Sequence, residues 1–262
     1  MFDYHIHTQL CKHAHGEIED YIRQAIESGL HEIAFTDHIP LPDNFDIAHR
    51  MAPFEMEKYQ RWIYKAREDF PEVKILFGIE ADYIPGLEAY LNDFLTRFDF
   101  DLVIMSVHFI PSWPDGNWVF GYDFPEKDKS QIFTEYIDVM ISGIETGLFD
   151  VVGHADIIKR PGESMLDTIP DKIANLLKAA KRSGMAIEFN TSGFRKVVGE
   201  PYPDPAWLPL IAEQNIPITI GSDAHTPDQL ALKFDHMTRI IRHAGIRHLA
   251  KYDQRKQAYQ LL

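Results

Sequence analysis

Short β-prone segments alternate with helical stretches about seven times along the chain, and this alternation restricts the possible folds more than any other feature. Several of the segments are continuously apolar, as strands buried on both faces of a parallel sheet are. Strands that alternate with helices are typical of a parallel α/β fold. The expected strands are Asp3 to His7, Glu32 to Thr36, Val73 to Glu80, Asp101 to His108, Asp150 to His154, Met185 to Asn190 and Pro217 to Asp223.

The segments between these strands have helical periodicity. Residues Glu17 to Ser28 place their apolar side chains on one face and are followed by Gly29, a common helix end. Further helices are expected over Phe54 to Phe70, Lys129 to Leu148, Asp171 to Ser183 and the C-terminal stretch Ile246 to Leu262. That last stretch is expected either to close the fold or to dock on a partner subunit. Residues 39–53 and 110–126 are rich in proline and turn residues and predict long loops, which often form or cover a site.

Side chains that can bind a metal ion stand at the end of nearly every expected strand. The ends are His5-Ile6-His7, Thr36-Asp37-His38, Gly78-Ile79-Glu80, Ser106-Val107-His108, Gly153-His154-Ala155-Asp156 and Gly221-Ser222-Asp223-Ala224-His225. In a parallel barrel these ends converge on one face, where the active sites of such folds lie. An open sheet would spread them along a line too long for one site. The pattern therefore favours a closed or distorted barrel.

The spacing within these motifs also favours metal binding. Residues two apart in a strand point to the same side, so His5 and His7 can approach one ion together, as can Asp223 and His225. His13 and His15 follow in a loop that can fold back over the barrel mouth. The chain has 13 histidines in all, and five of them lack such a pattern and are expected to be surface or core residues: His31, His49, His236, His243 and His248.

Imidazole and carboxylate ligands without thiolate suit zinc, iron, manganese or cobalt rather than magnesium or calcium. Nine or ten candidate ligands are too many for one ion, so the sequence predicts two or three ions with open positions for water and substrate. Such a cluster is suited to hydrolysis of a phosphate ester. A phosphate dianion also favours a guanidinium, and Arg160 and Arg195 lie just past strand ends. Asp37, Asp82 and Asp156, each beside a candidate ligand, are expected to orient imidazoles.

The order of the motifs resembles that of the PHP (polymerase and histidinol phosphatase) superfamily, in particular its stand-alone histidinol-phosphatase members. The resemblance runs from His5-Ile6-His7-Thr8 to the segment that ends at His225, and it includes Cys11 to Gly16, Phe35 to His38 and Gly78 to Tyr83. It implies a distorted (β/α)₇, TIM-barrel-like fold in which one ion is held by His5, His7, Glu80 and Asp223. A second ion would take Glu80 as a bridging ligand with His108 and His154. A third would take His13, His38 and His225, with His15 as an outer or alternative ligand.

The resemblance further implies hydrolysis of L-histidinol phosphate to L-histidinol and phosphate by a metal-bound hydroxide, a step of histidine biosynthesis. Glu80, Asp223 and Arg160 are then expected to be catalytic, and Arg160 and Arg195 to bind the substrate. Cys11 is expected to pack or to be sensitive to oxidation, not to act as a nucleophile. The loop aromatics and one acid could recognise the imidazole and ammonium of the substrate or simply pack, and most are expected to pack: Trp113, Trp118, Tyr122, Phe124 and Asp115.

Composition limits the alternatives. The net charge is −14, from 26 Lys+Arg and 40 Asp+Glu, which argues against a nuclease because nucleic-acid affinity depends on clustered basic residues. A phosphoesterase for another small metabolite, an amidohydrolase-type barrel and a non-enzymatic metal-binding module stay open. No linker or repeat divides residues 1–262, so one domain is expected. A single cysteine, no apolar run of membrane-spanning length and no secretory signal predict a soluble cytoplasmic protein, whose oligomeric state the sequence does not indicate.

Overall fold

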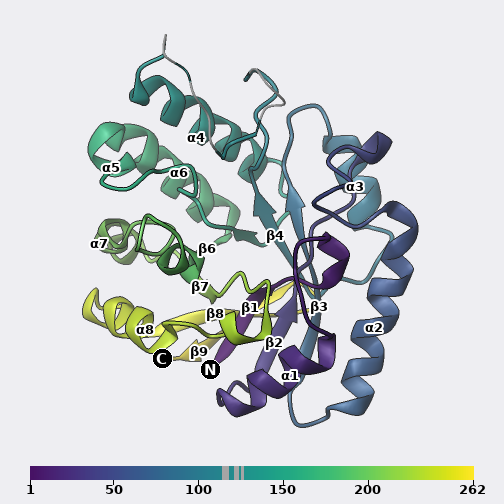
Figure 1. Ribbon diagram of the computed structural model, residues 1–262. Helices are drawn as coiled ribbons and strands as arrows, with labels where there is room; N and C mark the ends of the chain where they lie inside the picture. Colours follow the sequence, from purple (N-terminus) through teal and green to yellow (C-terminus); the bar gives the residue numbers. More distant parts are fainter. Residues whose placement is uncertain (114–117, 121–123, 125–126) are drawn as a thin grey trace.

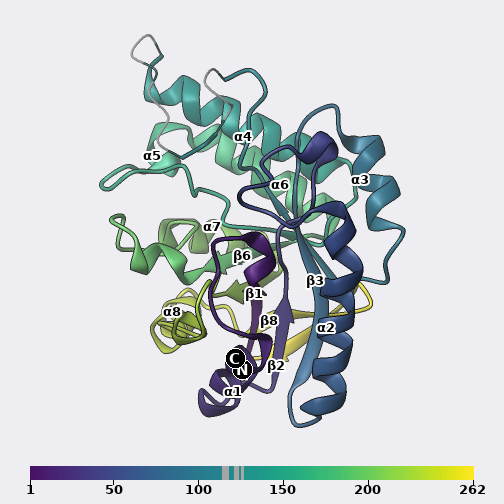
Figure 2. The ribbon, with the colours of Figure 1, turned by 45° about the vertical axis from the view of Figure 1, so that its right-hand side comes forward.

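The computed structural model describes residues 1–113, 118–120, 124 and 127–262 (Figure 1). Seven parallel strands follow one another in chain order around a barrel, and helices cover the outside (Figures 1 and 2). The strands are β1 (Phe2–Ile6), β2 (Glu32–Phe35), β3 (Lys74–Asp82), β4 (Leu102–Ser106), β5 (Val151–Val152), β6 (Ala186–Asn190) and β7 (Ile218–Gly221). The predicted distorted barrel of seven strands is therefore confirmed.

The barrel is nearly closed, because β1 and β7 meet only through a short bridge. The N–H of His7 donates to the carbonyl of Ala224 at 2.9 Å, and the N–H of Ala224 donates to the carbonyl of His5 at 3.2 Å. Ile6 and Ala224 form the single bridge pair between these two segments. The closure therefore lies directly beside residues that the sequence predicts to be ligands at both ends of the chain.

The helices begin and end where local chemistry predicts. Helix α1 (Ile18–Glu27) starts where the side chain of Asp20 accepts the N–H of Glu17 at 3.0 Å. Helix α6 (Pro170–Ser183) starts at proline and ends at Gly184, whose φ of 69° is left-handed. The other helices are α2 (Met56–Asp69), α3 (Glu88–Leu95), α4 (Lys129–Glu145), α5 (Met165–Thr168), α7 (Leu208–Glu213) and α8 (Phe234–His243).

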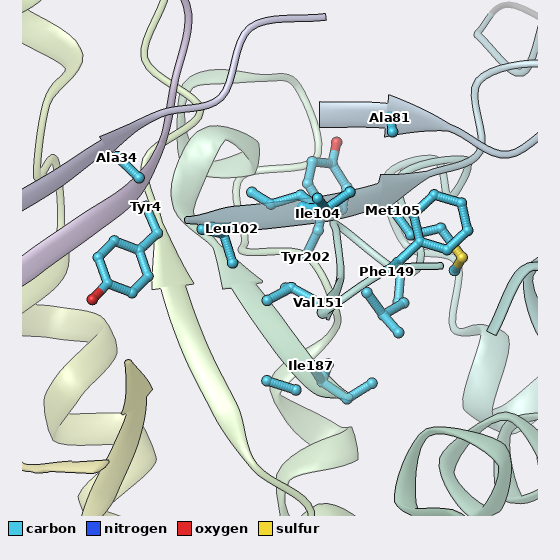
Figure 3. Close-up of a cluster of buried hydrophobic side chains, with 14 of the residues drawn as sticks. Tyr4, Ala34, Ala81, Leu102, Ile104, Met105, Phe149, Val151, Ile187 and Tyr202 are labelled. Carbon is cyan, nitrogen blue, oxygen red and sulfur yellow. The ribbon is translucent and has the colours of Figure 1, made fainter. Parts of the chain in front are cut away.

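The core is continuous across neighbouring strands. Side chains from β4, β5 and β6, among them Leu102, Ile104, Val151 and Ile187, lie together and are fully buried (Figure 3). Strands buried on both faces explain why these segments read as apolar runs rather than as alternating ones. Within the described parts of the chain, no helix combines the length and apolar character that crossing a bilayer requires.

The predicted C-terminal helix is wrong. Residues after 247 form an antiparallel hairpin of β8 (His248–Asp253) and β9 (Lys256–Leu261), joined at Gln254 and Arg255, both of which have positive φ. That backbone matches the tight turn that twisted hairpins prefer, although the usual asparagine and glycine are lacking. The hairpin covers the amino ends of the strands, where Arg255 donates to the carboxylate of Asp150 at 3.0 Å. It thus closes the end of the barrel opposite the strand-end histidines.

Candidate metal centre

Four side chains from three parts of the chain meet at the carboxyl ends of the strands. His5 and His7, on and just after β1, aim their Nε2 atoms at Oε2 of Glu80 on β3, and both distances are 3.5 Å. Oδ1 of Asp223, which follows β7, lies 3.2 Å from Nε2 of His7 and 3.9 Å from Nε2 of His5. Ligand atoms about 2.0–2.1 Å from a tetrahedral ion are separated by about 3.3 Å. These four donors therefore have the spacing of a metal site.

Glu80 turns its two oxygens toward different groups of histidines. Its Oε2 faces His5 and His7, whereas its Oε1 lies 2.9 Å from Nε2 of His154 and 3.8 Å from Nε2 of His108. The hydroxyl of Ser106 donates to the same Oε1 at 2.5 Å. Glu80 is almost completely buried. One carboxylate thus borders two adjacent donor sets, the arrangement expected of a bridging ligand.

The third predicted group is brought together at the mouth of the barrel. Nε2 of His13 and Nε2 of His225 lie 3.0 Å apart, and the ring of His38 is 5.5 Å from that of His13. Nδ1 of His38 also lies 2.7 Å from Oε2 of Glu80. Ring nitrogens of His7, His38 and His225 all lie within 4.8 Å of one another. The nine predicted ligands therefore form one continuous cluster, which is the geometry that the sequence predicts.

The buried donors of this cluster lack partners that would satisfy them. His38 lies 2.7 Å from Oε2 of Glu80 and Asp223 lies 3.2 Å from Nε2 of His7, but neither contact has the geometry of a hydrogen bond. Among the described residues, these two atoms and Nε2 of His5 therefore have no hydrogen-bond partner. A buried polar atom without a partner is costly, and a buried carboxylate more so. A divalent cation held between them would remove that cost. The donor atoms are imidazole nitrogens and carboxylate oxygens, which suit a transition metal ion.

The electrostatics of the cluster also favour bound positive charge. Burial alone would raise the pKa of Glu80, but the imidazoles of His38 and His5 outweigh it and hold that pKa well below its usual range. Burial would lower the pKa of His7, but the carboxylates of Asp223, Asp37 and Glu80 raise it to about 9. Burial, with His7 nearby, lowers the pKa of His225 to about 2. The inner carboxylates therefore stay ionised, while His225 stays neutral, as a metal ligand must.

A second layer of carboxylates orients the imidazoles. Asp82 lies 2.9 Å from Nδ1 of His108, as predicted, whereas Asp37 lies 3.7 Å from Nδ1 of His7, which is beyond hydrogen-bond distance. The prediction for Asp156 is wrong, because this carboxylate pairs with the ammonium of Lys159 at 3.0 Å. The residue that does orient an imidazole is Glu188 on β6, whose Oε1 lies 2.7 Å from Nδ1 of His5.

Glu188 was not predicted from the sequence, because it lies in the apolar run of β6. Its Oε2 accepts the N–H of His154 at 2.9 Å and the amide of Asn190 at 3.2 Å. Glu188 and Asn190 are two residues apart in a strand and so share a side, by the same rule that pairs His5 with His7. The signal was therefore present: an acid within a buried strand whose end faces the site.

Arg50 was also missed, because it lies in an irregular loop. Its guanidinium is buried, donates to the carbonyl of Ile39 at 2.9 Å and pairs with Oδ2 of Asp82 at 3.0 Å. It also holds Oδ2 of Asp46 through Nε and Nη2, at 3.2 and 3.0 Å. Arg50 thus connects the loop after β2 to the carboxylate that orients His108. No local pattern indicates such a contact.

The cluster opens into a cavity of about 480 Å³. Arg195 lines it, and its guanidinium donates to the carbonyls of Ser222 and Asp223 at 2.9 and 2.8 Å. These bonds hold the peptide of Asp223, whose φ of 54° is left-handed. Arg160 is exposed and is not among the described residues that line the cavity, so its predicted role stays a prediction. Lys196 lines the cavity and was not predicted.

Two further histidines lie near the site. His49 is exposed, as expected for a surface residue, but it also lines the cavity, where its ring stacks on Trp118 at 5.8 Å. His15 is exposed and lies outside the described lining of the cavity, and its backbone N–H donates to the carbonyl of His225. An outer-ligand role of the His15 side chain therefore has no support in this geometry.

The fourth loop contributes one wall of the cavity. Trp118 and Phe120 line it, with ring centroids 6.0 and 5.8 Å from that of His108. Trp113 and Phe124 are buried and contact each other at 5.0 Å, which confirms packing for these two. The predictions for Asp115 and Tyr122 lie outside the described residues. Two aromatic rings, tilted by 55° to each other, therefore stand beside the metal-competent cluster.

Cys11 is fully buried, and burial raises the pKa of its thiol far above the ordinary value. A thiol that stays protonated is a poor nucleophile. The structure therefore agrees with a packing role for Cys11.

A parallel barrel with a histidine and carboxylate cluster at the carboxyl ends of its strands defines the class of metal-dependent barrel hydrolases. Comparison with known proteins identifies the family within this class. The sequence model of the PHP domain matches residues 3–192. The chain belongs to the PHP domain family.

The relatives of the chain have consistent names. A protein of Deinococcus radiodurans named probable histidinol-phosphatase is 36% identical over 246 residues, which is 94% of both chains. A protein of Bacillus subtilis named histidinol-phosphatase is 29% identical, over 89% of this chain and 96% of its own. The crystal structure of histidinol phosphate phosphatase from Lactococcus lactis, complexed with zinc, L-histidinol and phosphate, has a TM-score of 0.84 and 23% identity, and the match covers 98% of both chains. That structural likeness supports the fold.

Proposed function

We propose that this chain is a metal-dependent histidinol-phosphatase, which hydrolyses L-histidinol phosphate to L-histidinol and phosphate. The observation that carries the proposal is the position of Glu80, whose two oxygens face two separate groups of histidines. The names of the Deinococcus radiodurans and Bacillus subtilis relatives supply the substrate. Residues 1–262 work as one domain in this proposal.

Two to three divalent transition metal ions, zinc, iron or manganese, are the cofactors in this proposal. The first would be held by His5, His7, Glu80 and Asp223, the second by Glu80, His108 and His154, and the third by His13, His38 and His225. When bound, such ions lower the pKa of a coordinated water and neutralise phosphate oxygens. Glu80 would contribute to two of these sites and Asp223 would be the other carboxylate of the first, so we expect activity to depend on both.

The residues of the chain itself bind and orient the substrate. Arg195 and Lys196 put positive charge at the cavity of a chain whose net charge is −14, and so they favour a phosphate monoester there. Arg195 keeps N–H groups beyond the two that hold the peptide of Asp223, since a guanidinium has five. Arg160 is a further candidate for the phosphate. Trp118 and Phe120 offer their faces to the imidazole of the leaving group.

Purified protein prepared without chelator tests this proposal. Metals are counted per chain by mass spectrometry, and the same sample is assayed with histidinol phosphate, an aryl phosphate and single-stranded DNA. We expect two to three ions and strong selectivity for histidinol phosphate. Equal, weak turnover of both phosphates would replace the proposal by a phosphoesterase of another small metabolite, and DNA degradation would replace it by a nuclease.

A matched pair of variants connects activity to the cluster. Glu80→Gln removes the charge of the bridging carboxylate, and we expect it to lose both bound metal and activity. Glu145→Gln makes the same change in a surface carboxylate that pairs with Arg182, with both side chains more than half exposed. We expect the second variant to match the wild type. Full activity of Glu80→Gln would refute the proposal.

A further inference from the structure

One lysine in a loop at the carboxyl ends of the strands has a buried ammonium group. The side chain of Lys159, in the loop after β5, has no exposed surface. Its ammonium lies 3.0 Å from Oδ2 of Asp156 and 2.9 Å from Oε1 of Glu200, and it donates to the carbonyl of Pro201 at 3.0 Å. It also lies 5.3 Å from the ring centroid of Tyr202. Its partners therefore come mostly from the loop after β6.

This ion network joins two loops at the mouth of the barrel. Asp156 lies on the β5 side, and its Oδ2 also accepts the backbone N–H of Asp204 at 2.8 Å. Lys159 and Asp156 thus both hold residues 200–204. A buried ion pair contributes little net stability, since desolvation of the charges offsets their attraction. A network of this kind is better explained by the positions that it fixes than by the stability that it adds.

The loop held by Lys159 is also tied together by backbone contacts of its own. Asn190 and Tyr202 exchange two backbone hydrogen bonds, at 2.6 and 2.9 Å, so the ends of the loop lie side by side. Gly193 packs so closely on the carbonyl of Glu200 that any side chain at that position would collide with it. A displacement of residues 200–202 would therefore be transmitted to residues 193–196. This is the segment that presents Arg195 and Lys196 to the cavity.

We infer that Lys159 is a positioning residue, which ties residues 191–204 to the loop after β5 and thereby fixes Arg195 and Lys196 at the cavity. The inference rests on the proposed function, in which these two cations meet the phosphate of the substrate. Lys159 lies outside the described lining of the cavity and acts only through the loop.

The test compares three variants in the metal-loaded enzyme. Lys159→Met keeps the length of the side chain and removes the ammonium. Glu200→Gln weakens the same network at a carboxylate that is 39% exposed, so it leaves the fold intact. Lys172→Met is the matched control, because Lys172 pairs with Asp138 on the surface. For each variant we measure kcat and KM for histidinol phosphate, the inhibition constant of inorganic phosphate, bound metal and thermal unfolding.

In the metal-saturated enzyme we expect Lys159→Met to raise KM and the inhibition constant of phosphate together by about tenfold to a hundredfold, because small misplacements of binding groups have effects of this size. Glu200→Gln should change both constants in the same direction by less, and Lys172→Met should change neither. A lower unfolding temperature with unchanged KM and phosphate inhibition would mean a merely structural role and would overturn the inference. If Lys159→Met does not fold, unchanged constants in Glu200→Gln overturn it.

A different result refutes the proposed function, namely a wild type that does not hydrolyse histidinol phosphate. In that case phosphate inhibition of aryl phosphate hydrolysis still tests the role of Lys159.

Discussion

Replacing Glu188 by glutamine tests whether the metal cluster depends on the carboxylate behind it. Glu188 accepts three hydrogen bonds, from Nδ1 of His5, the backbone of His154 and the amide of Asn190. A glutamine has one acceptor oxygen, so its NH₂ must face a donor. If it faces the backbone of His154, two buried donors lose this acceptor, the N–H of His154 and the amide of Asn190. If it faces His5, Nδ1 must become an acceptor, and the proton moves to Nε2, the atom aimed at the cluster.

Both arrangements weaken metal binding. Loss of a carboxylate behind a ligating histidine costs about 10-fold to 100-fold in metal affinity, which is about 1.4–2.7 kcal/mol. We therefore expect Glu188→Gln to bind the most tightly held zinc ion about 10-fold to 100-fold more weakly than the wild type. The assay is zinc titration of stripped protein against a chromophoric chelator, with Glu145→Gln as control. Wild-type affinity in Glu188→Gln would refute the assignment of Glu188 as the partner of His5.

Four further predictions follow from the structure. Removal of metal by a chelator should lower the stability by about 2.7 kcal/mol relative to protein at a free zinc concentration 100 times Kd, a fall of about 5–10 °C in thermal unfolding. Cys11, whose thiol pKa is raised by burial, should react with a maleimide at pH 8 only after denaturation, so rapid labelling of the native protein would contradict its burial. Arg255→Met should destabilise the chain by about 2 kcal/mol in denaturant unfolding with unchanged metal content, because it strips Asp150 of its ion pair at the far end of the barrel. Burial raises the pKa of Asp3 from 3.8 to about 6, so the stability that its bound proton gives is complete below pH 3.8 and is lost as the pH rises to about 6. In the metal-free protein, Asp3→Asn should lack this loss of stability between pH 3.8 and 6. A pH profile of unfolding identical to that of the wild type would refute the prediction.

The barrel and the ligand cluster could be predicted because both depend on local patterns. Several strands are apolar runs, and a predicted ligand stands at or just after the end of every strand except β6. Since all strand ends of a parallel barrel meet on one face, the strand pattern is enough to bring these residues to one face, whereas the grouping of His5 with Glu80 and Asp223 came from the resemblance to the PHP superfamily. The ligand positions need no knowledge of side-chain packing.

The C-terminal hairpin could not be predicted for a physical reason. Its turn residues, Gln254 and Arg255, have no intrinsic preference for positive φ, and β9 is largely exposed, so it lacks a buried face that would give a clear alternation. The hairpin is stabilised instead by contacts with distant residues, such as Tyr252 donating to the carbonyl of Asp150 at 3.0 Å. Arg50 and Lys159 were not predicted for the same reason, since each contacts partners that no spacing in the sequence indicates.

Two of the predicted ligands have a positive φ, which residues other than glycine rarely adopt. The residues that hold these conformations in place include one that the sequence did not indicate. Asp223 has a φ of 54° and His154 a φ of 20°. Such conformations cost about 1–3 kcal/mol each and persist only where the surroundings enforce them. The enforcing groups are Arg195, which holds the carbonyl of Asp223, and Glu188, which accepts the N–H of His154. The chain's own hydrogen bonds therefore help to hold both predicted ligands in place. Replacing Arg195 should therefore disturb the position of Asp223 as well as any contact with phosphate. We expect such a variant to lose activity and also to bind metal more weakly. A residue that only bound phosphate would leave metal binding unchanged.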